Sequence, residues 1–242
     1  MRPKHQKNDF HWSPELAYVI GLLVTDGNLS KDKRHIIMRS SDMDLLQTFK
    51  KCLNLSNKIS QSYNNGYATK PSYRIQFGNV GFYNWLMDIG LMPNKTHVIG
   101  EIKIPDEFFR DFLRGHLDGD GTIYHYQDRY NIYKGKRYIN TRIYTKFISA
   151  SKIHIEWLNK KIIKCLHLKG SLTCHKLKSL KWMWEIKFSK YDSIKLLQKI
   201  YYRDYLPSLE RKKNLARKII SSIKNNKLIR FNNTEYKTYV LR

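Results

Sequence analysis

The sequence predicts an α+β protein made of two similar units, each with the order helix, two strands, helix, two strands, helix. Three observations carry this prediction: an internal repeat, helical and strand patterns that recur in one order after each copy, and a length of 242 residues, which suits one large or two small domains. We expect two units related by a pseudo-twofold axis, with antiparallel sheets. Residues 1–100 would form the N-terminal half and residues 101–242 the C-terminal half.

The repeat is clearest in two helical segments that each end in Asp-Gly. Residues 17–27 match residues 111–121 at a constant offset of 94 positions. The residues that coincide at this offset include Gly21 with Gly115, Asp26 with Asp120, and Gly27 with Gly121. Chance does not readily produce so many matches in one order, so the two segments indicate a duplicated unit.

In the first unit, a helix is expected to begin after Ser13, an N-cap residue that is followed by Pro14 and by Glu15 in the first turn. Two further helices are expected at residues 43–53 and 82–89, where apolar residues recur at helical spacing. Residues 73–77 alternate with period two, which predicts a half-buried strand.

The second unit repeats these elements in the same order. Its first helix is expected to start near Pro105, with acidic residues in the first turn. A helix at residues 153–166, a strand at 184–188 and a helix at 193–201 follow. The segment 93–96, after the last helix of the first unit, corresponds to 210–213 in the second.

Each Asp-Gly helix carries a glycine in its middle, Gly21 or Gly115, which costs about 1 kcal/mol relative to alanine. Two helices that cross with their backbones in contact would explain this cost, so we expect the helices to pack together at these glycines. Gly27 and Gly121 are expected to end the two helices in a left-handed turn.

The aspartates before those final glycines are placed unfavourably for a helix, because the C-terminal end of the helix dipole is already negative. If the helices converge, Asp26 and Asp120 share one low-dielectric site that requires cations. Hard divalent ions held by carboxylate and phosphate oxygens meet this requirement, and they also serve phosphodiester hydrolysis. The alternative is two surface aspartates that cap unrelated helices.

The formal net charge of +25 favours a polyanionic partner, and nucleic acid is the commonest one. Residues 1–100 hold 13 basic and 7 acidic residues, whereas residues 101–242 hold 32 and 13. A membrane is disfavoured, because the basic residues are spread over many elements and the longest apolar run, residues 16–24, is too short to cross a bilayer.

Strand alternation indicates which side chains would meet the nucleic acid. Polar and basic residues occupy one face of the expected strands, and isoleucine and phenylalanine occupy the other. The candidates for DNA contact are Arg74, Gln76, Arg142, Tyr144, Lys146 and Lys187. A strand ribbon fits the major groove, where Arg, Lys and Gln can read base edges, while a solvated face without a partner is the alternative. The basic segment 211–230 is expected to grip phosphates.

The segments Ile20-Gly-Leu-Leu-Val-Thr-Asp-Gly27 and Arg114-Gly-His-Leu-Asp-Gly-Asp-Gly121 resemble the two signature helices of the LAGLIDADG family. The resemblance implies a monomer of two αββαββα units, whose curved sheets form a saddle over double-stranded DNA. It also implies that Asp26 and Asp120 bind Mg²⁺ at the two scissile phosphates, and Mn²⁺ is expected to substitute.

The chain departs from the family pattern at Val24, where an earlier acid is common. Asp118 keeps that acid in the second helix. Two positions along a helix correspond to about 200°, so Asp118 should face away from Asp120 and should not be a ligand.

The resemblance also implies supporting residues near the scissile phosphates. Lys95 and Lys212 fit the basic positions that follow the last helix of each unit, with Lys213 as an alternative in register. They would stabilise phosphate charge or polarise the attacking water, and an exposed lysine without such a role is the alternative. Ser41 and Ser151, each just before the second helix of its unit, are candidates to orient solvent.

The function implied is a sequence-specific, metal-dependent endonuclease that cuts DNA at a long asymmetric site. Two alternatives stay open: a maturase of the same fold that binds intron RNA, and a DNA-binding protein without catalysis. The three cysteines and the polar, basic residues 1–12 predict an intracellular protein without a targeting signal. Frequent Lys, Asn, Ile and Tyr associate with AT-rich genomes, so we expect an organellar (mitochondrial or chloroplast), bacterial or phage gene.

Overall fold

The computed structural model describes residues 10–62, 71–133, 135–177 and 180–224. The N-terminal unit contains, in order, α1 (Pro14–Thr25), β1 (Gly27–Leu29), β2 (His35–Ser40), α2 (Met43–Cys52), β3 (Ile59–Ser62), β4 (Ser72–Gly78), α3 (Val80–Asp88) and the short 3-10 helix η1 (Lys95–His97). The C-terminal unit contains η2 (Asp106–Phe108), α4 (Phe109–Gly119), β5 (Thr122–Tyr133), β6 (Lys136–Ser149), α5 (Lys152–Leu166), β7 (Ser171–Lys176), β8 (Trp182–Phe188), α6 (Lys190–Ile200) and α7 (Glu210–Lys224).

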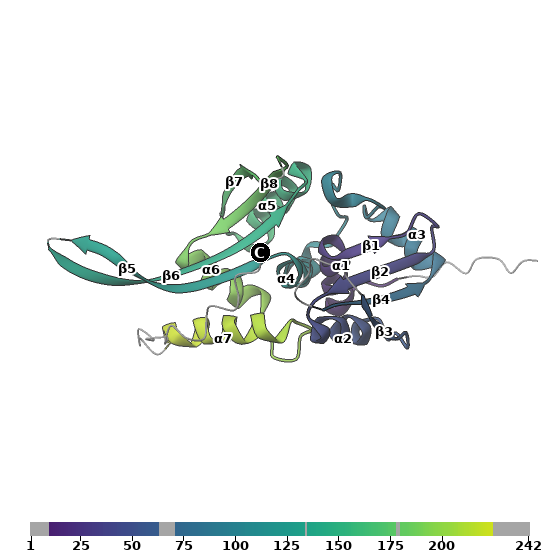
Figure 1. The fold of residues 1–242 in the computed structure, drawn as a ribbon, viewed down its shortest axis with the longest axis horizontal. Helices are drawn as coiled ribbons and strands as arrows, with labels where there is room; N and C mark the ends of the chain where they lie inside the picture. Colours follow the sequence, from purple (N-terminus) through teal and green to yellow (C-terminus); the bar gives the residue numbers. More distant parts are fainter. Residues whose placement is uncertain (1–9, 63–70, 134, 178–179, 225–242) are drawn as a thin grey trace, which may run out of the picture.

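The two units share one sheet topology. The strand order is β1-β2-β4-β3 in the first sheet and β5-β6-β8-β7 in the second, and every neighbouring pair is antiparallel. Figure 1 shows the sheets on either side of a central pair of helices, α1 and α4. The predicted α+β class with two αββαββα units is confirmed.

The helices α1 and α4 cross at the two glycines that the sequence singles out. A Cβ atom on Gly21 would lie 2.2 Å from the carbonyl oxygen of Phe112, and one on Gly115 would lie 2.1 Å from that of Tyr18. Every residue of α1 from Ala17 to Val24 is buried, so this helix lies in the interior of the whole molecule. The predicted backbone contact is confirmed, and it joins both units in one core.

The expected left-handed turns at Gly27 and Gly121 are wrong. Neither glycine has a positive φ, because the chain passes from each helix directly into the extended strands β1 and β5. Glycine is needed for a different reason. A Cβ at Gly27 would lie 2.5 Å from the carbonyl oxygen of Leu23, and one at Gly121 would lie 2.8 Å from that of Leu117, so the strand can fold back over its helix only without a side chain.

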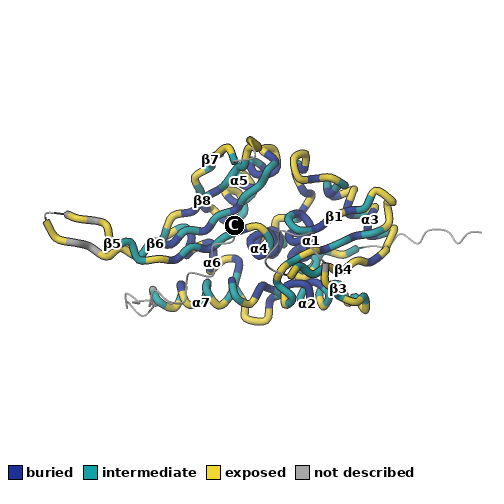
Figure 2. The backbone as a smooth tube through the Cα atoms, viewed as in Figure 1, coloured by how far each residue is buried: buried dark blue, intermediate teal, exposed yellow. Residues whose placement is uncertain are grey.

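Two features distinguish the C-terminal unit. The strands β5 and β6 have 12 and 14 residues, against 3 and 6 in β1 and β2, and Figure 1 shows this hairpin projecting beyond the rest of the fold. Its far end is largely exposed, as Figure 2 shows. The helix α7 reaches the other unit, where Arg211 pairs with Asp42 at 2.9 Å.

No helix in the described parts of the chain combines the length and apolar character needed to span a bilayer. The basic segment 211–230 forms α7 as far as Lys224, and its remaining residues lie outside the described part.

Candidate active site

Asp26 and Asp120 occupy equivalent positions at the C-terminal ends of α1 and α4. Each is the C-cap residue of its helix, with φ and ψ of −99° and −3° for Asp26 and −92° and −7° for Asp120. The helix ends touch, because a Cβ on Gly119 would lie 2.0 Å from Thr25 Oγ1 and 2.7 Å from Asp26 Oδ2. The fold therefore brings the two predicted aspartates to one place.

The protein around the two carboxylates disfavours their charged forms. Burial, together with the neighbouring Asp120, raises the pKa of Asp26 to about 7, against the hydrogen bond that Thr25 donates to it at 3.3 Å. Burial also raises the pKa of Asp120, opposed by Lys212 and Lys95. Asp120 remains accessible to solvent and Asp26 is half-buried, so an ion or a substrate can reach the pair.

A buried lysine contacts the residue that follows each aspartate. The ammonium group of Lys95 donates to the carbonyl oxygen of Gly27. The ammonium group of Lys212 donates to the carbonyl oxygen of Gly121 at 2.7 Å. The two lysines thus make the same contact in the two units, on the residue that follows each aspartate. They also offset the negative ends of the two helix dipoles.

The two lysines differ in how many hydrogen bonds their ammonium groups donate. Lys212 also donates to the carbonyl oxygens of Leu117 at 2.6 Å and Asp118 at 2.9 Å, which leaves its ammonium group surrounded by backbone acceptors. Burial lowers its pKa to about 8. The alternative in register, Lys213, donates instead to the carbonyl oxygen of Asp204, so Lys212 is the lysine that lies at the aspartates.

Asp118 lies inside the protein and joins the two units. Its carboxylate accepts hydrogen bonds from the Tyr18 hydroxyl at 2.9 Å, the Tyr201 hydroxyl at 2.9 Å and the Leu209 backbone N–H at 2.7 Å. Tyr18 belongs to α1 of the other unit, so this buried carboxylate crosses the helix interface. These contacts agree with the expectation that Asp118 is not a ligand.

The structure does not support the predicted role of Ser151, whereas that of Ser41 stays a prediction. Ser151 is buried as the N-cap of α5, and its hydroxyl donates to the carbonyl oxygen of Ile99 at 2.6 Å. Ser41 is an exposed residue in the turn before α2. The serine that lines the cavity beside Asp120 is Ser149, two residues earlier than expected. Strand alternation alone could not show which serine faces the cavity, because Ser151 caps α5 and so does not follow the strand pattern.

Comparisons with known proteins agree with this geometry. A family model described as a LAGLIDADG-like domain matches residues 13–82. The solved structure of the I-LtrWI LAGLIDADG homing endonuclease bound to its target DNA superposes with a TM-score of 0.55 and 14% identity, over 88% of this chain and 91% of that one. The chain has the LAGLIDADG fold.

Other matches to this LAGLIDADG-fold chain extend the comparison. The homing endonuclease I-SmaMI bound to cleaved DNA has a TM-score of 0.57 and 13% identity, over 89% of this chain and 91% of that one. Full-length DUF199/WhiA from Thermatoga maritima has a TM-score of 0.52 and 18% identity, over 94% of this chain and 66% of that one. An uncharacterized protein of Methanocaldococcus jannaschii is 26% identical over 125 residues, which is 49% of this chain and 45% of that protein.

The site fits a divalent cation of the kind that LAGLIDADG endonucleases imply. Asp26 and Asp120 are hard oxygen donors whose pKa values are raised by burial, although Lys95 and Lys212 lie close enough to oppose the shift. No group of three or more His, Cys, Asp or Glu residues suited to a metal occurs in the described part of the chain. The two carboxylates would therefore leave other positions to water and phosphate oxygens, the ligand set that Mg²⁺ commonly keeps.

A cavity of about 70 Å³ adjoins Asp120 and contains residues that the sequence did not single out. Its polar lining residues are Thr25, Lys95, Thr96, His116, Asp120, Ser149 and His154. The two histidines are buried and lie with their Nε2 atoms 3.2 Å apart, and burial lowers their pKa values to about 3 for His116 and about 4 for His154. The repeat held a signal for His116, because Leu22 stands opposite it at the offset of 94.

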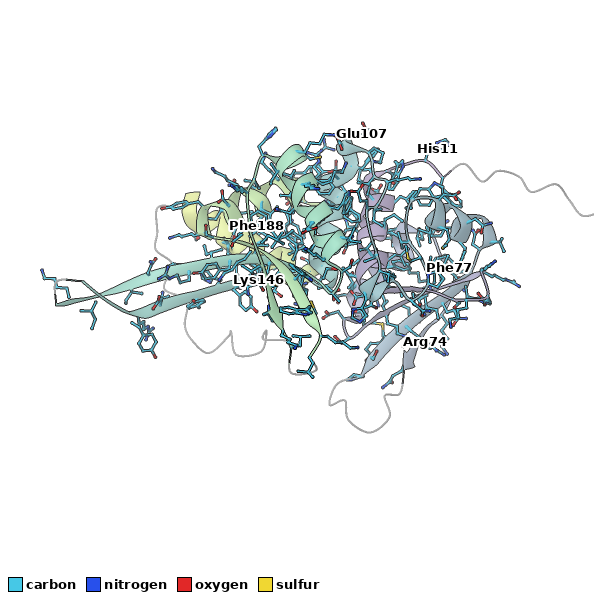
Figure 3. All side chains as sticks on the ribbon, turned by 90° about the horizontal axis from the view of Figure 1, so that it is seen from above. His11, Arg74, Phe77, Glu107, Lys146 and Phe188 are labelled. Atoms are coloured by element: carbon cyan, nitrogen blue, oxygen red, sulfur yellow. The ribbon has the colours of Figure 1, made fainter. Side chains whose placement is uncertain are left out.

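The predicted DNA-contact residues of the LAGLIDADG-fold chain lie on the outward faces of both sheets. Ile75, Ile143 and Ile186 are buried on the opposite faces, as the alternation predicts. Figure 3 shows Arg74 on the side of the molecule away from Glu107 and His11, and Lys146 on the strands of the C-terminal sheet.

Several of these side chains are held in place by neighbours. Lys187 lies 4.1 Å from the centre of the Tyr144 ring, Lys146 pairs with Glu185 at 3.0 Å, and Arg142 pairs with Asp128 at 3.1 Å. Such contacts preorganise cations and aromatic rings on a sheet surface.

Proposed function

We propose that the chain is a divalent-metal-dependent endonuclease that cuts double-stranded DNA at a long, asymmetric sequence. The observation that carries the proposal is the pair Asp26 and Asp120 at the touching ends of α1 and α4, each with a buried lysine behind it. The shared fold supports it, because I-LtrWI and I-SmaMI are homing endonucleases whose structures hold target or cleaved DNA. The net charge of +25 supports a polyanionic partner.

Asp26 and Asp120 would hold Mg²⁺, with Mn²⁺ as a substitute. When bound, the ion supplies charge neutralisation at the phosphate and acidifies bound water. The two lysines would have different roles. Lys212, enclosed by carbonyl oxygens, fixes the end of α4 and so the position of Asp120. Lys95 lines the cavity with Asp120, so we assign it the contact with phosphate or attacking water.

The test uses a randomised DNA library to select the cleaved sequence in the presence of Mg²⁺, followed by Asp26→Asn and Asp120→Asn on that sequence. Each variant should lose double-strand cleavage by several orders of magnitude and should still bind the DNA, because the amide keeps the shape but not the charge. Chelation of the metal in the unaltered protein should have the same effect. Undiminished double-strand cleavage by either variant would refute the mechanism.

A second candidate is a DNA-binding protein of the same fold that does not cut. It takes up the fold match to full-length DUF199/WhiA, which covers 94% of this chain. This candidate predicts retained binding without nicking in Mg²⁺ or Mn²⁺, so the same selection separates the two. Binding of intron RNA stays a prediction, and the protein's affinity for its own intron transcript would test it.

A further inference from the structure

A second pocket lies beside the candidate active site. It has a volume of about 460 Å³ and is lined by His97, Ala150, Lys152, Cys174, Lys181, Trp182 and Trp184. Ala150 also lines the cavity that contains Asp120, and His97 follows Thr96 of that cavity. The pocket therefore adjoins the place where the proposed function puts the scissile phosphate. It combines residues of η1 from the first unit with the β7–β8 hairpin of the second.

The two tryptophans extend an apolar face beyond the core. Along β8, Ile186 and Phe188 point inward and are buried, and Trp184 and Trp182 share their face because side chains alternate along a strand. Trp182 is nevertheless 53% exposed. Tryptophan rings that are only partly buried are enriched at binding interfaces.

Two lysines lie beside these rings. Lys152 Nζ lies 5.2 Å from the centre of the Trp184 ring, and Lys181 also lines the pocket. None of the seven lining residues carries a carboxylate. A flat ring joined to an anionic group matches this combination, because it can stack on indole while its charge meets the ammonium groups.

We propose that this pocket binds an unpaired nucleobase of the bound nucleic acid, stacked on the tryptophans, with Lys152 and Lys181 at its flanking phosphates. The proposal rests on the proposed function, because Ala150 lines both this pocket and the cavity of Asp120. Stacking on an aromatic side chain tolerates any base, so the pocket would select for an unstacked nucleotide and not for a sequence. A base that is already unpaired is the easiest to extrude.

The experiment compares two short duplexes of the same arbitrary sequence, one fully paired and one with a single bulged 2-aminopurine. Binding is measured by fluorescence anisotropy in a chelator, so cleavage plays no part. The unaltered protein should bind the bulged duplex about tenfold more tightly, the effect of roughly one base stack. Its 2-aminopurine fluorescence should fall as the base stacks on indole. Trp182→Ala should lose both effects and still bind the paired duplex normally.

Two further variants give matched controls. Tyr191→Ala removes an aromatic ring that is 75% exposed and lies outside the pocket, so it should keep the preference for the bulge. Trp182→Phe should keep most of it, because a flat ring remains.

Binding of the paired duplex without a preference for the bulge would overturn the pocket and leave the proposed function intact. A preference that survives in Trp182→Ala would also overturn it. If the unaltered protein binds neither duplex, that result would instead contradict DNA binding itself.

Discussion

Replacing Gly21 by alanine tests the central helix crossing most directly. The new Cβ would lie 2.2 Å from the Phe112 carbonyl oxygen and 2.7 Å from the His116 backbone nitrogen, and neither atom can rotate away. To restore a contact distance of about 3.5 Å, α1 and α4 must separate locally by about 1 Å. That separation opens the core that both units share.

The expected cost follows from two opposing effects. Overpacking of a core typically costs about 1–3 kcal/mol, and a collision with backbone lies at or above the top of that range, at about 4 kcal/mol. Alanine recovers about 1 kcal/mol of helix propensity relative to glycine. The net loss of about 3 kcal/mol corresponds to a fall in Tm of about 6–12 °C for a chain of this size.

Scanning calorimetry of the metal-free protein measures this fall, with Gly100→Ala as the matched control. A Cβ on Gly100 has only one neighbour within 4 Å, Ile153 Cγ2 at 3.8 Å, so that variant should keep the Tm of the unaltered protein. A Gly21→Ala protein with a Tm equal to that of the control would refute the reasoning, because the helices would then have room that the crossing geometry denies.

Three further predictions concern buried polar groups. Lys212→Met should lower the free energy of unfolding by about 2–3 kcal/mol in urea titrations, since several carbonyl oxygens lose a charged donor, and Lys95→Met should cost less. Tyr18→Phe should cost about 1.5–3 kcal/mol in the same assay, because the buried Asp118 carboxylate loses a donor, and an unchanged midpoint would contradict this. His116 and His154 have lowered pKa values, so the unfolded chain binds more protons than the folded one between pH 6.5 and about 4, and stability should fall as the pH falls through that range. The double variant His116→Leu/His154→Leu should flatten this dependence of Tm on pH.

Much of the fold could be predicted from the sequence because it is encoded twice. The offset that aligns Gly21 with Gly115 also aligns Asp26 with Asp120. A single hypothesis, that the two helices cross, therefore predicted where all four residues lie. The start of α1 at Pro14 followed from local capping chemistry, and Ser13 accepts the expected hydrogen bond from the Leu16 backbone N–H at 3.1 Å.

The errors arose where contacts in the folded chain override the preference of a single residue. Gly27 was expected in a left-handed turn, but the strand that follows it passes too close to Leu23 for any side chain. Ser151 was expected to orient solvent, but helix capping and Ile99 occupy its hydroxyl. The cavity histidines come from α4 and α5, and no local pattern shows that these two helices meet.

The unequal hairpins have a consequence for how far the molecule can reach. β6 has 14 residues and β2 has 6, which at about 3.3 Å per residue gives roughly 45 Å against 20 Å. Along a duplex that rises about 3.4 Å per base pair, one ribbon can follow about thirteen steps and the other about six. The DNA footprint of this molecule would extend further from its centre on the side of the longer hairpin. If two equal flanks are shortened from their outer ends, binding would weaken earlier on that side than on the other.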